Sequence, residues 1–246
     1  MLATLFRLEV LKARRSLALL MVLACPLMVV LLNTGLLLRQ AGPDGIGARA
    51  WQGFWMGNQA LWCYFMLPLY LALCTGLVNA VEHRQNGWRL MLTLPVGARR
   101  LYLAKLLVAL ALAMAALAHL CLLLLAMAVG ALPLGGSAGA EPAWAMATAL
   151  LAALAASLPV LVLQHTLSWT SQNIVLPLAL GVCATMGIIQ LGSSEYWRFF
   201  PWTYPLMAAN GSDPAMRQTA LVLGMGSGLV LLALGCWWAG YRRQPA

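Results

Sequence analysis

The chain has 246 residues, of which 63% are hydrophobic and 9% are charged. Soluble domains contain roughly half apolar and about a quarter charged residues, so this composition excludes an ordinary water-soluble enzyme. The formal charge of +9 does not indicate a nucleic-acid-binding protein, because the basic residues lie beside apolar runs and not on one solvated face.

Six apolar stretches are long enough, or nearly so, to cross a bilayer, which takes about 20 helical residues. The sequence therefore predicts an all-α membrane protein, with residues 1–246 forming a single polytopic transmembrane domain. The predicted spans are residues 17–38, 60–81, 101–132, 143–163, 174–191 and 219–241. The first span is too long for the apolar part of a signal peptide. Pro26, Pro68 and Pro159 predict kinks in the first, second and fourth spans.

The distribution of basic residues predicts the orientation of these spans. With both ends in the cytoplasm, that side carries eleven basic and two acidic residues, whereas the outer side carries four of each. The cytoplasmic parts are then the basic segment 1–16, the loop 82–100 and the C-terminal tail. The two longest loops, 39–59 and 192–218, face outside. We expect a multi-pass protein of the bacterial inner (cytoplasmic) membrane.

Aromatic residues flank two of the predicted spans. Because amphipathic rings favour the headgroup layer, these residues are predicted to be interface anchors. They are Trp51, Phe54 and Trp55 before the second span and Trp237, Trp238 and Tyr241 at the end of the sixth.

The chain contains no recognisable catalytic or metal-binding motif. A G-x-x-x-x-G-K-[ST] phosphate loop is missing from the sequence, so the chain has no ATP-binding motif of its own. Gly224 and Gly228 have the spacing that lets two membrane helices pack closely. The six cysteines lie in apolar segments without a C-x-x-C pair and are predicted to be small core residues. We expect no catalytic residue, no metal and no cofactor bound by this chain.

His119 is the one ionisable residue deep inside a predicted span. Such a residue can be a proton relay or a substrate contact. A neutral histidine hydrogen-bonded between two helices is the favoured interpretation, since no carboxylate lies within a predicted span. The same absence argues against an ion-coupled carrier.

The cytoplasmic loop 82–100 is too polar for lipid and too apolar for a free linker. Asn86-Gly87 indicates a turn, and Pro95 ends any helix that follows it. A short helix over residues 88–94 would expose an apolar patch beneath the membrane. Such a patch implies a protein partner or contact with lipid headgroups.

The chain resembles a known family at several points. A basic start before the first span, six spans, and a glutamate followed by a glycine and by Leu-Pro between spans two and three resemble the permease subunits of ABC type-2 exporters. Among these, the chain is most similar to the lantibiotic-immunity permeases, which share an outer loop like residues 200–205. The residues that carry the resemblance are Glu9, Lys12, Arg14, Arg15, Glu82, Gly87, Leu94 and Pro95.

The resemblance implies a type V exporter-like transmembrane domain. Its loop 82–100 would be a coupling helix that docks on a separate ATPase subunit, and that subunit would bind ATP and Mg. The implied coupling residues are Glu82, Arg84, Gly87, Trp88, Arg89, Leu94 and Pro95. The N-terminal segment with Glu9, Lys12, Arg14 and Arg15 would be an interfacial helix, although Glu9 falls between Leu5 and Phe6 on the helical wheel.

The late outer loop is implied to form short re-entrant or interfacial helices, and an ordinary aromatic anchor remains equally open. Its marker residues are Trp197, Phe200, Trp202 and Tyr204.

The leading hypothesis is the permease subunit of an ATP-driven exporter for a hydrophobic or amphipathic cargo, such as a peptide antibiotic, a drug or a lipid. It would contact membrane lipids and pair with a second permease subunit. One alternative is an assembly or sensor protein that uses the same cytoplasmic patch. The other is a lipid-modifying membrane enzyme with His83, His119 or His165 as its acid-base residue, which requires a polar cluster at one depth that the sequence does not show.

Overall fold

The computed structural model describes residues 2–14, 16–40, 45–84, 97–130, 140–210 and 212–241, with only the backbone described at 81–84 and 140–142. The regular elements in these ranges are all helices. They are α1 (Leu2–Ala13), α2 (Leu17–Arg39), α3 (Ala48–Leu61), the π turn η1 (Trp62–Met66), α4 (Leu67–Arg84), α6 (Ala98–Gly130), α7 (Ala140–Ala156), α8 (Leu158–Thr170), α9 (Val175–Leu191), the 3₁₀ turns η3 (Glu195–Phe199) and η4 (Pro201–Thr203), α10 (Tyr204–Ala209) and α11 (Pro214–Tyr241).

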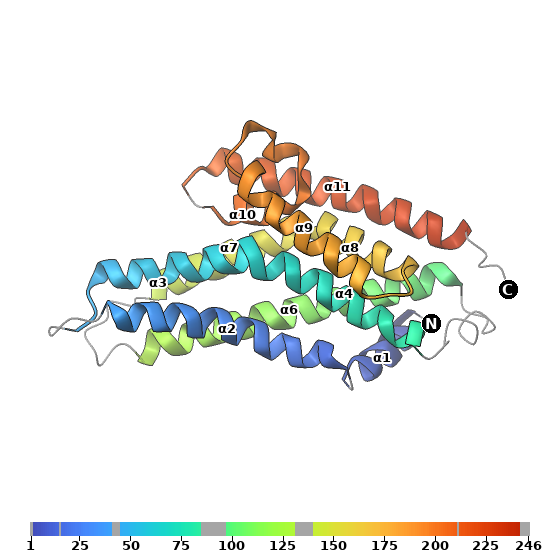
Figure 1. Ribbon diagram of the computed structural model, residues 1–246, viewed down its shortest axis with the longest axis horizontal. Helices are drawn as coiled ribbons and strands as arrows, with labels where there is room; N and C mark the ends of the chain where they lie inside the picture. The colour runs from blue at the N-terminus through green and yellow to red at the C-terminus, as the bar shows by residue number, and fades with distance from the viewer. Residues whose placement is uncertain are drawn as a thin grey trace.

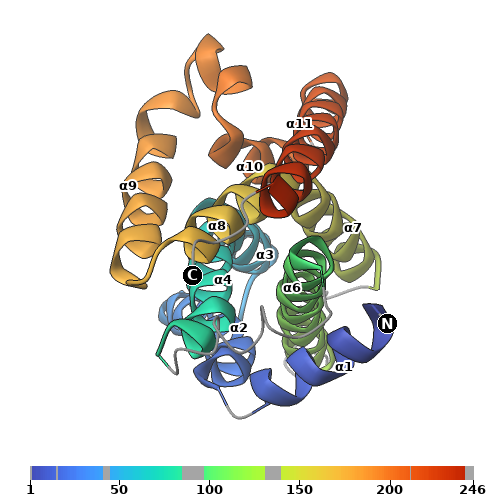
Figure 2. The same cartoon turned by 90° about the vertical axis from the view of Figure 1, so that its right-hand side faces the viewer.

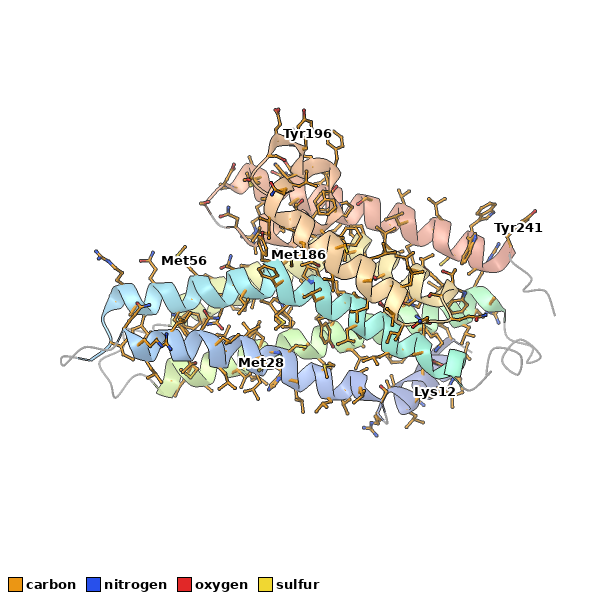
Figure 3. The ribbon with its side chains drawn as sticks, in the orientation of Figure 1. Lys12, Met28, Met56, Met186, Tyr196 and Tyr241 are labelled. Atoms are coloured by element: carbon orange, nitrogen blue, oxygen red, sulfur yellow. The ribbon has the colours of Figure 1, made fainter. Side chains whose placement is uncertain are left out.

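The long helices run along the long axis of one bundle (Figure 1). Helix α6 packs against α2, and α8 packs against both α4 and α11. Viewed from the end, α9 lies on the flank of the bundle, and α1 lies across the first part of α6 (Figure 2). Lys12 and Tyr241 lie at one end of the bundle and Met56 lies at the other (Figure 3). We call these the α1 end and the α3 end.

Four of the described helical runs are long and apolar enough to cross a membrane. They are Leu17–Arg39, Ala48–Ala80, Ala98–Gly130 and Pro214–Tyr241. Helices α7 and α8 meet the same criterion as a pair, with a bend of 47° between them, whereas α9 is a shorter apolar helix. Large apolar side chains are exposed along α2 and α11, as expected for surfaces that face lipid. These features describe a multi-pass membrane protein with four or five candidate spans among the described residues.

Two of the three kinks predicted from proline coincide with irregular helix geometry. Pro159 lies in the first turn of α8, directly after the break at Ser157. The backbone N–H of Leu67 donates to the carbonyl of Trp62, five residues back, so a π turn directly precedes Pro68. Pro26 is buried inside α2, which continues through it.

The second helical run begins earlier than predicted. Residues 39–59 were expected to form an outer loop, but α3 begins at Ala48 and continues through η1 into α4. Trp51, Phe54 and Trp55 are 3–8% exposed and belong to the core, so their prediction as interface anchors is wrong. The physical reason is that α3 packs against α2, and the rings make edge-to-face contacts with centroids 5.7 Å apart. Trp237 and Tyr241, by contrast, are exposed and stacked on each other.

Two glycines of α11 lie where the helix approaches the break between α7 and α8. A Cβ atom added to Gly224 would overlap the backbone of Ala156. One added to Gly228 would lie 2.6 Å from Cγ of Leu158. Only glycine allows this close approach of α11 to the bent pair.

The variant Gly224→Ala is expected to lower the free energy of unfolding by about 1–3 kcal/mol, because overpacking forces α11 away from Ala156. Nothing lies within 4 Å of a Cβ added to Gly226 on the same helix. Gly226→Ala is therefore the matched control, expected to be neutral or to stabilise by up to about 1 kcal/mol. Thermal unfolding in detergent measures both, and equal losses would contradict the packing role.

Candidate functional site

An ionic cluster lies at the α1 end of the bundle, and the described residues in it are Glu9, Lys12 and Lys105. The ammonium nitrogen of Lys105 in α6 lies 2.7 Å from Oε2 of Glu9 in α1, and that of Lys12 lies 2.6 Å from Oε1 of the same carboxylate. Lys105 also donates to the carbonyl oxygen of Val78 in α4, at 3.1 Å. Glu9 is 3% exposed and Lys105 is fully buried. The cluster therefore joins α1, α4 and α6 through buried charges.

The burial of these charges corrects one sequence-based interpretation. Lys105 is one of the eleven basic residues assigned to the cytoplasmic side; it lies at the α1 end, and its side chain is buried in the helix packing. Glu9 appeared to interrupt the apolar face of the N-terminal helix, and it is instead the residue that faces α6. Burying one charge alone is costly, and a partner within hydrogen-bond distance offsets that cost. Two features of the sequence could have indicated this pair: Glu9 is the single acidic residue of α1, and Lys105 lies near the start of an apolar span.

A second group of polar side chains lies beside the cluster, which we call the histidine network: Asn79, Tyr102, His165 and Thr166. The side-chain nitrogen of Asn79 lies 3.2 Å from Nδ1 of His165, whose Nε2 lies 3.2 Å from the carbonyl oxygen of Tyr102. Since asparagine donates here and the carbonyl accepts, the geometry fits the tautomer with the proton on Nε2. The network joins α4, α6 and α8.

Tyr102 extends this network toward α11. Its hydroxyl lies 2.8 Å from Oγ1 of Thr166, which itself donates to the carbonyl of Val162. The Tyr102 hydroxyl is therefore the donor in this pair. A Cβ atom added to Gly235 of α11 would lie 2.5 Å from the Tyr102 hydroxyl oxygen, so glycine leaves the space that this side chain occupies.

The ionic cluster and the histidine network lie next to the predicted coupling loop. Val78 and Asn79 are in the last two turns of α4, which ends at Arg84. Tyr102 and Lys105 are in the first two turns of α6, which begins at Ala98. Helix α4 leads into loop 82–100, and α6 follows the loop. Both helices are thus bonded to α1 and α8 close to the loop.

The predicted coupling residues themselves are only partly described. Glu82 and Arg84 belong to the last turn of α4, and their side chains lie outside the described part. Five others fall outside the described residues: Gly87, Trp88, Arg89, Leu94 and Pro95. Arg15 is also outside this part, and Arg14 follows α1 as an exposed residue. The roles predicted for these residues stay predictions.

The late aromatic loop forms η3, η4 and α10. The ring centroids of Trp197 and Tyr204 are 6.5 Å apart and perpendicular, and those of Phe200 and Trp202 are 5.6 Å apart and stacked. The Tyr204 hydroxyl donates to the carbonyl of Arg198 at 2.6 Å. Burial raises the pKa of Tyr204, so the phenol stays protonated and keeps this donor. Trp197 and Tyr204 pack with residues of α7 and α11, which makes the loop a compact cap.

His119 lies apart from both groups. Its Nδ1 atom is 3.3 Å from the carbonyl oxygen of Val22 in α2. This contact agrees with the interpretation of a histidine bonded between two helices.

The polar cluster that the sequence did not show is thus present at the α1 end, where its side chains make hydrogen bonds and ion pairs between helices. Within the described ranges, no group of three or more His, Cys, Asp or Glu side chains is placed to hold a metal ion. The arrangement is suited to fastening helices to one another.

Comparison with protein families decides the class of this protein. The model of the ABC-2 family transporter proteins matches residues 5–188, well over half of the chain. The chain belongs to this family. A search of curated proteins found no match, and neither did a search of solved structures.

The family assigns a transport role to the chain as the membrane component of an ABC transporter, with an ABC ATPase as its general partner. The matched range includes the ionic cluster, the histidine network and loop 82–100, for which the coupling role is predicted. It ends within α9, so the aromatic loop, α10 and α11 lie beyond it.

Proposed function

We propose that the chain is the transmembrane permease subunit of an ATP-driven exporter in the bacterial inner membrane, with six spans and cytoplasmic ends. The position of α1 and of the end of α11 at the same end of the bundle supports an even number of crossings. The crossing that is still needed, the fifth in chain order, would be α9, which at 1.5 Å per residue is about 26 Å long. That is slightly less than the roughly 30 Å hydrocarbon core, and local thinning of the bilayer accommodates the difference.

The α1 end would face the cytoplasm. Basic residues gather in the segments at this end, including Lys12, Arg14, Arg99 and Arg100. Cytoplasmic segments carry an excess of lysine and arginine, which supports this orientation.

The observation that carries the proposal is the placement of the buried ionic cluster beside loop 82–100. An ATPase that displaces this loop acts directly on α4 and α6. Because Lys105 links Glu9 to the carbonyl of Val78, and His165 links Asn79 to Tyr102, α1 and α8 would move with them. Packed cores and interfaces switch between discrete arrangements, so a small displacement at the loop would shift several helices together.

Two such subunits, identical or related, would enclose the translocation path, each with one ATPase that binds ATP and Mg. ATP-driven closure of the ATPases would favour one of two conformations of the pair, through differential binding. The predominantly apolar spans favour a hydrophobic or amphipathic cargo that enters from the bilayer, such as a peptide antibiotic, a drug or a lipid. In the lantibiotic-immunity group, such export would protect the cell.

Sequencing the neighbouring reading frames for an ABC ATPase with a phosphate loop, followed by co-expression of that ATPase with this chain, tests this proposal. We expect the two proteins to co-purify and the permease to change the rate of ATP hydrolysis. Deletion is expected to sensitise the cell to a peptide antibiotic. An assembly or sensor protein would instead co-purify with a different protein, and transport activity of the purified chain without any ATPase would contradict the proposal.

A further inference from the structure

A groove of about 460 Å³ opens at the α3 end of the bundle, opposite the ionic cluster. Trp51, Trp55 and Met56 of α3 line one wall, and Ala145 and Ala149 of α7 line the other. The remaining side is formed by the end of α10 and by Arg217 in the first turn of α11. None of the residues that line the groove belongs to loop 82–100, to the ionic cluster or to the histidine network.

The groove is large enough for a ligand and its walls are preformed. A cavity of about 150 Å³ holds a benzene molecule, and typical ligand pockets measure about 300–1,000 Å³. Trp51 and Trp55 are buried and their positions are fixed by the ring contacts of Phe54. The side-chain amide of Gln59 donates to the carbonyl of Ala209 at 2.6 Å, which fastens α3 to α10 beside the groove.

The polar side of the groove is cationic. Arg217 is half-buried, and among the described residues its guanidinium has no ion-pair partner. Among the described residues, no acidic side chain lines the groove, and the other polar groups at its rim are neutral. A guanidinium in this setting favours an anionic oxygen ligand, and its planar fork matches a phosphate well.

The position of the groove across the membrane favours one source of such a ligand. This step rests on the proposed orientation, in which the α3 end lies at the outer face of the membrane. At that depth, the abundant molecule that carries both a phosphate and an apolar chain is a phospholipid. Trp144, the neighbour in sequence of the groove residue Ala145, is exposed and is of the residue type that lies at the headgroup layer.

We infer that this groove binds one anionic phospholipid, with its phosphate at Arg217 and an acyl chain along the wall of Trp51, Trp55 and Ala149. The site is separate from the coupling machinery. Its lipid would hold α3, α7 and the start of α11 together on the outer side.

Native mass spectrometry of the full-length chain in a mild detergent, titrated with dioleoyl phosphatidylglycerol, tests this site. We expect one lipid to be retained, and Arg217→Gln to weaken its apparent affinity about tenfold, the order expected for losing a charge-assisted contact. Ala145→Trp, which fills the groove from an exposed position, is expected to weaken it similarly.

Two variants serve as matched controls. Arg39→Gln removes an exposed charge at the end of α2, and Gly53→Trp adds an indole on α3 where nothing lies within 4 Å of an added Cβ. Both are expected to retain the lipid as the wild type does, with unchanged ATPase stimulation in all four variants. That readout separates failure of this site from failure of the proposed transport role.

Three results would overturn the inference. One is equal retention of phosphatidylglycerol by all four variants. A second is displacement of the ligand by inorganic phosphate alone, with no requirement for an acyl chain. The third is a change of oligomeric state in Arg217→Gln and Ala145→Trp without a change in lipid retention, which would make the groove an interface with a second copy.

Discussion

Replacing Glu9 with glutamine is expected to lower the free energy of unfolding by about 3–5 kcal/mol, the range for removing one partner of a buried ion pair. The substitution removes the carboxylate that lies 2.7 Å from the fully buried ammonium of Lys105 and 2.6 Å from that of Lys12. Glutamine keeps the size of the side chain, so the loss reports on charge and not on packing. Unfolding of the purified chain by heat or by a denaturing detergent measures it.

Two further variants separate the buried pair from the exposed one. Lys12 is one-third exposed, so Lys12→Gln is expected to cost at most about 1 kcal/mol. The double variant Glu9→Leu with Lys105→Met is expected to recover much of the loss, because apolar replacement of a buried pair is often neutral. Equal losses in Glu9→Gln and Lys12→Gln, or no recovery in the double variant, would contradict the central position given to Lys105.

The double variant Trp88→Ala with Arg89→Glu is expected to reduce transport at least about tenfold while leaving the melting temperature of the spans unchanged. The physical reason is that it removes an aromatic anchor and reverses a charge at the proposed contact with the ATPase. ATP hydrolysis and export, measured on the same reconstituted complex, should lose their dependence on one another.

A control for this experiment lies at the opposite end of the bundle. Trp144 of α7 is 73% exposed, and Arg39 is exposed at the end of α2. The pair Trp144→Ala with Arg39→Glu makes the same chemical changes far from the loop and is expected to preserve coupling. Loss of coupling in this pair, or its preservation in the Trp88 and Arg89 variant, would count against the assignment of the loop.

Much of the fold followed from the sequence because lipid requires every backbone hydrogen bond to be made within a helix. The apolar stretch 17–38, for example, corresponds closely to α2 at Leu17–Arg39. The start of α3 did not follow, because residues 48–59 are only moderately apolar and are helical through their packing against α2. The same packing determines whether Trp51 lies in the core or at an interface, and no local pattern reports it.

The candidate site was less accessible from the sequence than the fold. Glu9 and Lys105 are 96 residues apart, so their pairing depends on how α1 crosses α6. Likewise, Asn79 and His165 meet only because α8 packs on α4. The motifs of loop 82–100 could be identified from the letters because a turn, an apolar run and a proline are local signals. These motifs carry the resemblance to the transporter family. The buried charges close to the loop, by contrast, depend on contacts between helices that are far apart in the sequence.

Photo-crosslinking from position 88 tests the central claim most directly. With a photoreactive amino acid in place of Trp88, illumination of whole cells is expected to join the chain to the ATPase subunit, with a yield that changes when ATP is trapped. Absence of that adduct, together with labelling of position 88 by a membrane-impermeant reagent added outside, would contradict the account.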